Sequence, residues 1–341
     1  MSLLRPAPSG QPVLTLGLLG FNPHQRADLT AKAQHAQSGG QAWRLSGFWD
    51  ADAWWINGSN TRLLPDGNLR VQAGMPSERA VTLSMEEINR PIAFSTPLTS
   101  KAFEPRCAFA PDSRTEIDAV LKQFGDWLQP VLFKAALGER IIGRGAALRG
   151  RVYHVRHHSR LLAVLDFRRG KAALLANAQP ADLLDAIWDQ RPPSASDAPP
   201  GFIACTPAQI IWTHVRHSGQ DQLPERYRSE TIYYRHVPRV PMGWLGDSML
   251  SLLRALSGEP CNFRTLGRRT GIDSAALAQD LACLYYAGAI TTTPMKAAQT
   301  GFPPNALPTA RAGNESRDSV QGRSTLPPID SDRTVPAMLR S

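Results

Sequence analysis

Histidine is the residue type in this chain that most readily suggests chemistry, because histidines recur in two similar segments. Residues 153–158 read Tyr-His-Val-Arg-His-His, and residues 213–217 read Thr-His-Val-Arg-His. Imidazole is a common zinc ligand, so these five histidines invite a metal hypothesis. We expect His154 to point to solvent from a β-hairpin, and His214 and His217 to lie one turn apart at a helix end, which suits a partly charged imidazole. No carboxylate or thiol completes a ligand spacing, so the sequence predicts no metal and no cofactor.

Motifs for catalysis are missing from the sequence. The cysteines Cys107, Cys205, Cys261 and Cys283 lie far apart, with no Cys-x-x-Cys pair. This pattern indicates neither a zinc ribbon nor a disulfide framework, and it fits a reducing compartment. No serine stands in a Gly-x-Ser-x-Gly context, and the chain has neither a Walker loop nor Gly-x-Gly-x-x-Gly. Because paired-carboxylate motifs are missing too, we predict that the protein is not an enzyme.

Arg140 and Arg144 form an Arg-x-x-x-Arg pair before an expected β-region. The spacing resembles that of PilZ domains, which bind cyclic dinucleotides, and guanidinium pairs do bind phosphates. The second element of that family, Asp/Asn-x-Ser-x-x-Gly, is missing, because residues 166–170 have the wrong spacing and no serine. A cyclic-dinucleotide receptor is therefore a second alternative, and it requires the two arginines to converge.

The length and the net charge of the chain limit the classes of protein to which it can belong. With 341 residues, of which 42% are hydrophobic, the chain suffices for two or three globular domains. The net charge of +9 permits a nucleic acid, an anionic lipid or an acidic protein as partner, but the basic residues are scattered. The longest N-terminal apolar run, residues 13–19, is too short for a membrane span. We expect a cytoplasmic protein with no signal peptide and no membrane insertion.

Strands and helices alternate along the first part of the chain. An apolar run at residues 13–20 predicts a buried strand, and residues 24–37 predict a helix after Asn22-Pro23. Further strands are expected at 42–45, 54–57, 69–72, 80–83 and 91–95, and an amphipathic helix at 116–133. The alternation predicts an α/β domain over residues 13–134, after a flexible lead at 1–12.

The order and size of this expected domain are similar to those of the receiver domain of bacterial response regulators. A receiver carries an acidic pair after its first strand, which holds Mg²⁺, and an aspartate after its third strand, which accepts phosphate. Here residues 20–22 contain no carboxylate, Asn57 stands at the acceptor position, and the family's Lys-Pro becomes Thr96-Pro97. The resemblance implies a degenerate receiver that cannot be phosphorylated. An unrelated small α/β or α+β domain is the alternative.

The middle of the chain, residues 139–240, predicts an α+β domain. Its expected elements are strands at 151–156, 161–167, 172–176 and 231–234, a short helix at 180–189, a loop at 191–200 and a helix from Thr206 to about His217. The chain after about residue 296 is rich in small and polar residues and has no apolar periodicity, which predicts a disordered tail over 296–341.

Residues 242–295 carry the signals of a helix-turn-helix. Asp247 can cap a first helix, Asn262 starts a short second one, and Gly271 lies in a tight turn. A third helix after Asp273 has an apolar stripe, and residues 289–293 predict a strand. This order resembles a winged-helix core, so the fold class that we predict is α/β plus α+β with a C-terminal winged-helix-like domain.

The partner of this helix-turn-helix follows from the charge of its third helix. That helix has no Lys or Arg, although Lys and Arg dominate contacts to DNA. No wing follows the last strand, and three arginines lie on or just after the second helix. The candidate contact residues, for DNA or for a protein, are Arg264, Arg268, Arg269, Gln279 and Tyr286. We expect a protein partner, with a DNA-binding transcriptional regulator as the first alternative.

Tryptophans also cluster in the N-terminal part, at Trp43, Trp49, Trp54 and Trp55. Neighbouring strand residues point to opposite faces, so Trp54 and Trp55 must point apart. We expect a core-only cluster, and one exposed ring that acts as a protein-contact anchor is the alternative. Together these patterns predict a non-catalytic signalling adaptor. They leave its oligomeric state open.

Overall fold

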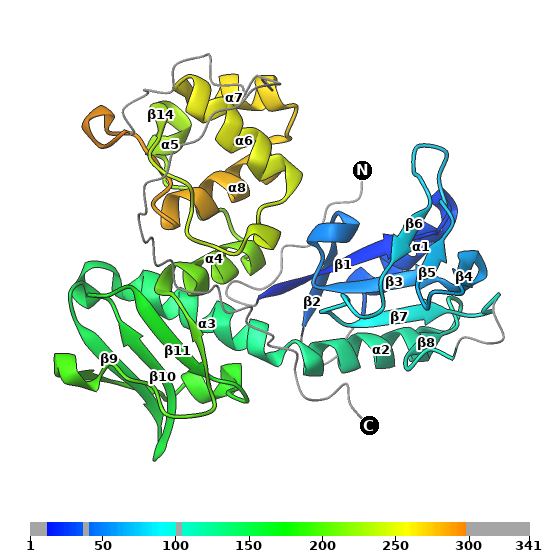
Figure 1. Ribbon diagram of the computed structural model, residues 1–341, viewed down its shortest axis with the longest axis horizontal. Helices are drawn as coiled ribbons and strands as arrows, with labels where there is room; N and C mark the ends of the chain where they lie inside the picture. The colour runs from blue at the N-terminus through cyan, green and yellow to red at the C-terminus, as the bar shows by residue number, and fades with distance from the viewer. Residues whose placement is uncertain (1–11, 37–40, 100–103, 298–341) are drawn as a thin grey trace, which may run out of the picture. The chain divides into compact units, whose positions relative to one another are not determined.

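The computed structural model describes residues 12–36, 41–99 and 104–297 (Figure 1). Within these residues the protein is a mixed α/β structure with eight α-helices and several sheets. Most of the expected lead and nearly all of the expected tail lie outside the described residues. Among the helices that are described, none combines the length and the apolar character that crossing a membrane requires.

A parallel five-stranded sheet forms the N-terminal part, with strand order β2-β1-β3-β7-β8 (Figure 1). Its strands are β1 (Val13–Leu19), β2 (Ala42–Leu45), β3 (Ala53–Asn57), β7 (Ile92–Ser95) and β8 (Ala108–Phe109). All seven residues of β1 and all five of β3 are buried. Continuous burial is expected where both faces of a parallel sheet are covered, which explains their unbroken apolar runs.

Two different layers cover the faces of this sheet. The helices α1 (Pro23–Gln34) and α2 (Arg114–Trp127) pack on one face, where Trp55 is buried. On the other face lies a small antiparallel sheet of β4 (Thr61–Leu63), β5 (Leu69–Val71) and β6 (Val81–Leu83). Trp54 is buried beneath that sheet. The two rings do point apart, as expected, but neither is exposed.

The helix expected at 116–133 is two helices. The first, α2, ends at Trp127, and the second, α3 (Gln129–Arg144), begins after Leu128. Pro130 explains the break, because proline has no N–H to donate to the preceding turn but is well tolerated in the first turn of a new helix. The second helix runs through the expected boundary between residues 134 and 139.

A second five-stranded sheet, antiparallel and of order β12-β9-β10-β11-β13, forms the middle part (Figure 1). Its strands are β9 (Val152–His157), β10 (Arg160–Asp166), β11 (Lys171–Leu175), β12 (Ile187–Arg191) and β13 (Phe202–Cys205). Two helices, α3 and α4 (Pro207–His217), contribute Leu137 and Ile210 to its core. They approach closely at Gly138, where an added Cβ would lie 2.5 Å from Cβ of His214.

The two edge strands of this sheet were not predicted from the sequence. Instead of a helix at 180–189, a short 3-10 turn at Pro180–Leu183 is followed by β12, and β13 follows the expected loop. Each edge strand pairs with one neighbour only, β12 with β9 and β13 with β11. Edge strands bury little apolar surface, so pairing with the sheet determines their conformation more than their own side-chain pattern does.

The C-terminal helical part contains α6 (Asp247–Gly258), α7 (Phe263–Thr270) and α8 (Ser274–Tyr286), preceded by the short α5 (Arg226–Ser229). Gly271, with φ +69°, separates α7 from α8, and Asp273 caps α8 as expected. The cap of α6 is Gly246 rather than Asp247. Gly246 has no side chain to form a capping hydrogen bond, and Asp247 lies in the first turn.

A three-stranded sheet accompanies these helices. Its central strand, β14 (Thr231–Tyr234), pairs with β15 (Cys261–Asn262) on one side and β16 (Ile290–Thr291) on the other. The sequence places β14 in the middle domain, 139–240, but its backbone hydrogen bonds join it to the C-terminal helical part.

Leu281 tests the packing of α8. Its side chain is fully buried, so Leu281→Ala should lower the free energy of unfolding by about 2–5 kcal/mol, measured by urea denaturation. Leu250, on α6, is 43% exposed, so the matched change Leu250→Ala should cost less than about 1 kcal/mol. Equal costs at the two positions would contradict the packing described for α8.

Candidate functional site

Asn57, at the expected phosphate-acceptor position, is buried at the end of β3. Its Nδ2 donates a hydrogen bond to the carbonyl oxygen of Gly20 over 2.9 Å, and its Oδ1 accepts one from the backbone N–H of Ser59 over 3.1 Å. The hydroxyl of Ser95 donates a longer bond to the same Oδ1, 3.4 Å. The amide therefore links the ends of β1, β3 and β7 by hydrogen bonds, and both of its polar atoms have hydrogen-bond partners.

The third helix of the expected helix-turn-helix, α8, is enclosed on two sides. Asp280 and Cys283, expected off the apolar stripe, are buried. The Nε2 of Gln279 donates to the carbonyl oxygen of Arg216 at the end of α4, over 2.8 Å. Asp280 accepts a hydrogen bond from Ser248 over 2.7 Å, and burial raises the pKa of its carboxyl. Much of α8 therefore packs inside the molecule, while Gln279 is half-buried and Ser274 and Ala275 are exposed.

The candidate contact residues therefore separate into two groups. Arg264, Arg268 and Arg269 are exposed together on α7, and Arg269 forms an ion pair with Glu259, 2.5 Å from Nη2 to Oε2. Tyr286 is half-buried, and its ring contacts that of Tyr285. Gln279 and Tyr286 are thus half-buried, whereas the three arginines are exposed.

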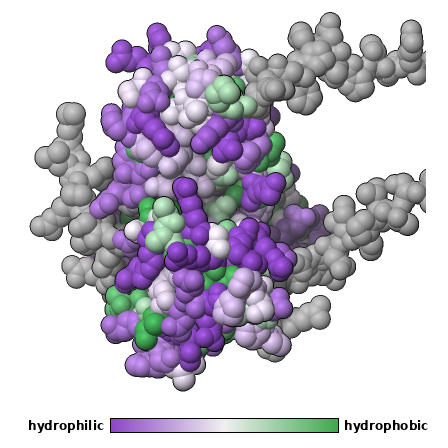
Figure 2. All heavy atoms as spheres, turned by 90° about the vertical axis from the view of Figure 1, so that its left-hand side faces the viewer, coloured by the Kyte–Doolittle hydropathy of each residue, from purple (hydrophilic) through white to green (hydrophobic). Residues whose placement is uncertain are grey.

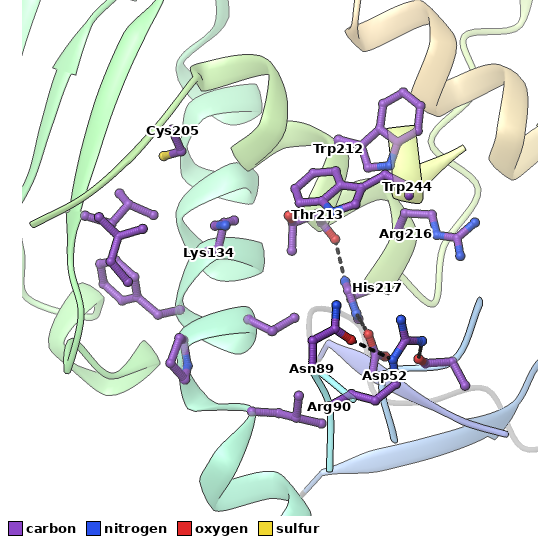
Figure 3. Close-up of a pocket in the computed structure, with 18 of the residues that line it drawn as sticks. Asp52, Asn89, Arg90, Lys134, Cys205, Trp212, Thr213, Arg216, His217 and Trp244 are labelled. Atoms are coloured by element: carbon purple, nitrogen blue, oxygen red, sulfur yellow. Dashed lines mark hydrogen bonds and ion pairs between the residues drawn. The ribbon is translucent and has the colours of Figure 1, made fainter. Parts of the chain in front are cut away.

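A pair of residues far apart in sequence provides the most constrained polar contact. His217, the last residue of α4, is buried, and its Nε2 lies 3.0 Å from Oδ1 of Asp52 just before β3. Oδ2 of Asp52 accepts hydrogen bonds from the backbone N–H and the hydroxyl of Thr15, over 2.8 and 2.7 Å. The other imidazole nitrogen, Nδ1, lies 2.7 Å from the carbonyl oxygen of Thr213. Figure 3 shows the contacts of His217 with Thr213 and Asp52 beside a cavity.

The hydrogen bonds of this contact depend on the protonation of the imidazole. A carbonyl oxygen and a carboxylate are both acceptors, so one ring nitrogen of His217 donates in the neutral form and both donate in the protonated form. Burial acts to raise the pKa of Asp52, but the charge of His217 and the hydrogen bonds from His217 and Thr15 outweigh burial and lower it. Asp52 and His217 therefore form a hydrogen-bonded contact, which is an ion pair when the imidazole is protonated, and it joins the N-terminal part to α4.

The cavity beside this ion pair has a volume of about 310 Å³. Residues of the N-terminal, middle and C-terminal parts line it, among them Asp50, Leu174 and Trp244. Figure 3 shows Lys134 on α3 with Trp212 and Trp244 on one side and Cys205 on the other. The cavity thus combines aromatic rings, aliphatic side chains and charged groups.

Lys134 and Cys205 are the potentially reactive side chains in the wall of the cavity. The Lys134 ammonium lies 5.7 Å from the ring centre of Trp244, and burial lowers its pKa. Within the described residues it makes neither a hydrogen bond nor an ion pair. Burial raises the pKa of the Cys205 thiol to about 11, so this cysteine is a neutral thiol and a poor nucleophile at neutral pH.

The histidines of the first segment lie elsewhere. His154 is half-buried rather than solvated, and its Nε2 lies 2.8 Å from the carbonyl oxygen of Ala195. Over the part of the chain that the structure describes, no three residues of the types His, Cys, Asp or Glu are grouped so that they could hold a metal ion.

The Arg144 guanidinium stacks over Trp188, 4.3 Å from the ring centre, and burial together with the nearby charge of Arg140 lowers the pKa of Arg144.

Sequence reasoning missed the central residue of this site. Asp52 lies directly before a buried strand, 165 positions away from His217, and no motif connects them. Trp54 and Trp55 are buried, as the core-only interpretation predicts, but Trp49 is 61% exposed at the cavity. Comparisons of the chain with models of protein families, with curated proteins and with solved structures found no match.

Asp52 should give the folded protein a defined pH dependence. The pKa of Asp52 is lowered on folding, so its stabilising effect is complete above the ordinary aspartate pKa and is lost as the pH falls through the folded value. Asp52→Asn should lower the free energy of unfolding by about 1.5–3 kcal/mol at pH 7, because it removes the buried carboxylate that contacts His217 and accepts two hydrogen bonds from Thr15.

The difference between the wild type and Asp52→Asn should shrink below about pH 4, as denaturation at several pH values would show. Asp197→Asn, in an exposed loop, is the control and should change little. A loss of stability that is independent of pH would contradict the ion pair.

Proposed function

We propose that this protein is a non-catalytic regulatory adaptor that acts through contacts with a protein partner. The observation that carries the proposal is the enclosure of α8 between its own core and α4. A helix that reads DNA must lie with one face free in the major groove. With Asp280 and Cys283 buried, the exposed side chains of α8 are limited to Ser274 and Ala275 at its start, whereas α7 exposes three arginines.

The N-terminal part supports a regulatory role. Its strand order corresponds to the 2-1-3-4-5 order of doubly wound sheets, which receiver domains share. At the position of the phosphate acceptor, Asn57 is an amide that already bonds Gly20 and Ser59. On this proposal the part is receiver-derived and cannot use phosphorylation as its signal.

The C-terminal helical part supports a winged-helix-like origin. The elements α6, β15, α7, α8 and β16 follow one another in the order helix, strand, helix, helix, strand, and β14 completes a three-stranded sheet. We propose that this scaffold contacts protein, because an origin in DNA-binding folds does not fix what a domain binds.

The exposed arginines of this part indicate the chemistry of the partner. Arg264 and Arg268 lie one turn apart on α7, and Arg254 is exposed on α6. Such a basic surface fits an acidic protein surface, in a chain whose net charge is +9. On the face drawn in Figure 2, hydrophobic residues are scattered among hydrophilic ones, which is consistent with a polar contact rather than a broad apolar one.

DNA binding is the second candidate, because the same arginines could reach phosphates. Contacts of that kind give affinity without sequence preference and depend strongly on salt. The two candidates therefore differ in whether a defined DNA sequence is selected.

The arginine pair on α7 provides the test. Full-length protein should bind genomic DNA fragments weakly and without sequence preference at physiological salt, by fluorescence anisotropy. Chemical cross-linking in the native host, followed by mass spectrometry, should capture a protein with an acidic surface. The double variant Arg264→Ala and Arg268→Ala should reduce that capture by about tenfold or more, as expected for charged contacts that contribute about 1–2 kcal/mol together.

The matched control is Arg62→Ala with Arg70→Ala, two exposed arginines opposite each other on β4 and β5. This control should leave the capture unchanged. A sequence-specific nanomolar complex with a defined DNA site would contradict the adaptor and support the regulator. Equal capture by the two double variants would place the contact elsewhere and contradict the assignment to α7.

A further inference from the structure

The cavity beside Asp52 and His217 has the size and composition of a small-molecule site. Its volume of about 310 Å³ lies at the lower end of the range for ligand pockets. One wall is aliphatic, with Val131, Leu174 and Ile203, and Trp212 and Trp244 add two aromatic rings. A flat or aliphatic group of modest size would bury its surface against these side chains.

The charged groups in the wall favour an anion. Arg90, Lys134 and Arg216 are cationic, whereas Asp50 and Asp52 are anionic, so the wall carries one more positive than negative charge without counting His217. Asp52 contacts His217 over 3.0 Å. Asp50 faces the N-terminus of α6, since a Cβ added to Gly246 would lie 2.7 Å from its Oδ1, and a helix N-terminus is itself electropositive.

Two of the cations are held by protein groups. The Nη1 of Arg90 donates to the carbonyl oxygens of Trp49 and Ala51, over 2.9 and 2.5 Å, and Nη1 of Arg216 lies 3.9 Å from Oδ1 of Asp280. Lys134 differs from both, because the described residues give its half-buried ammonium no hydrogen bond and no carboxylate. Its ammonium has the Trp244 ring beside it, at 5.7 Å, but no acceptor for its N–H groups, so an anion would supply the missing hydrogen bonds.

We propose that this cavity binds a small organic anion, with a carboxylate or phosphate group on the Lys134 ammonium and a flat apolar body against Trp244 and the aliphatic wall. Burial lowers the pKa of Lys134, and an anion beside the ammonium would counteract that shift. The ligand would touch the N-terminal, middle and C-terminal parts at once, so its binding would stabilise their arrangement. The proposal does not depend on the adaptor function.

Four probes separate the two features of the proposed ligand. Benzoate and phenyl phosphate carry both an anion and a ring, benzyl alcohol carries the ring alone, and inorganic phosphate carries the anion alone. Each is titrated into the full-length protein while tryptophan fluorescence is followed, because Trp49, Trp212 and Trp244 line the cavity. At least one of the two ring anions should give a saturable change, with an affinity at least about tenfold higher than that of benzyl alcohol or inorganic phosphate.

Variants at position 134 locate the site. Lys134→Met keeps the aliphatic stem and removes the charge, so it should weaken binding of the ring anion by about tenfold or more, whereas Lys134→Arg should stay within about threefold of the wild type. Lys122→Met, at an exposed position on α2, is the matched control and should bind as the wild type does. Circular dichroism and thermal melting of each variant show whether it is folded.

Three results would overturn the proposal. These are the lack of a saturable change with either ring anion, equal binding of a ring anion and of benzyl alcohol or inorganic phosphate, and unchanged binding by folded Lys134→Met. If Lys134→Met does not fold, the affinities of Lys134→Arg for the four probes test the proposal instead. This variant keeps the charge, so it must still bind a ring anion more tightly than benzyl alcohol or inorganic phosphate. Preference for benzoate or for phenyl phosphate would identify the head group.

Discussion

The ion pair between Asp52 and His217 is the interaction on which the arrangement of the described chain depends. It joins the start of β3 to the last residue of α4, and Thr15 on β1 holds the second carboxylate oxygen. Helix α4 in turn packs along α3 and receives Gln279 from α8 at its C-terminal carbonyl groups. A single largely buried carboxylate therefore fixes the helix on which the middle sheet and the C-terminal helices both rest.

This constraint also determines which surfaces are left for function. Because α8 is held against α4 and carries no Lys or Arg, the exposed arginines of the C-terminal helices lie on α5, α6 and α7. Because α3, α4 and the segment before β3 converge around the ion pair, they enclose a cavity with an unpaired lysine in its wall. The proposed adaptor role and the proposed anion site are thus two consequences of one packing arrangement, and each can be tested without the other.

Local signals in the sequence predicted most strands and helix starts, and the structure shows why. The run at β1 is buried on both faces, and the caps at Asn262 and Asp273 form the expected bonds to backbone N–H groups. Long-range pairing explains the failures: β12 and β13 are strands because a neighbouring strand pairs with them. The second buried face of α8 and the pairing of Asp52 with His217 arise from contacts between distant segments, which a single sequence does not encode as a pattern.

The most direct test of this account is a double-mutant cycle on the ion pair. Urea denaturation at pH 7 would give the free energies of unfolding of the wild type, Asp52→Ala, His217→Ala and the double variant. Each single change also removes other contacts, and the cycle cancels these. The account predicts that the two changes are not additive, with a coupling energy of about 1.5–3 kcal/mol, as for hydrogen bonds between charged partners. A coupling energy below about 0.5 kcal/mol would show that the two residues act independently, and would contradict the account.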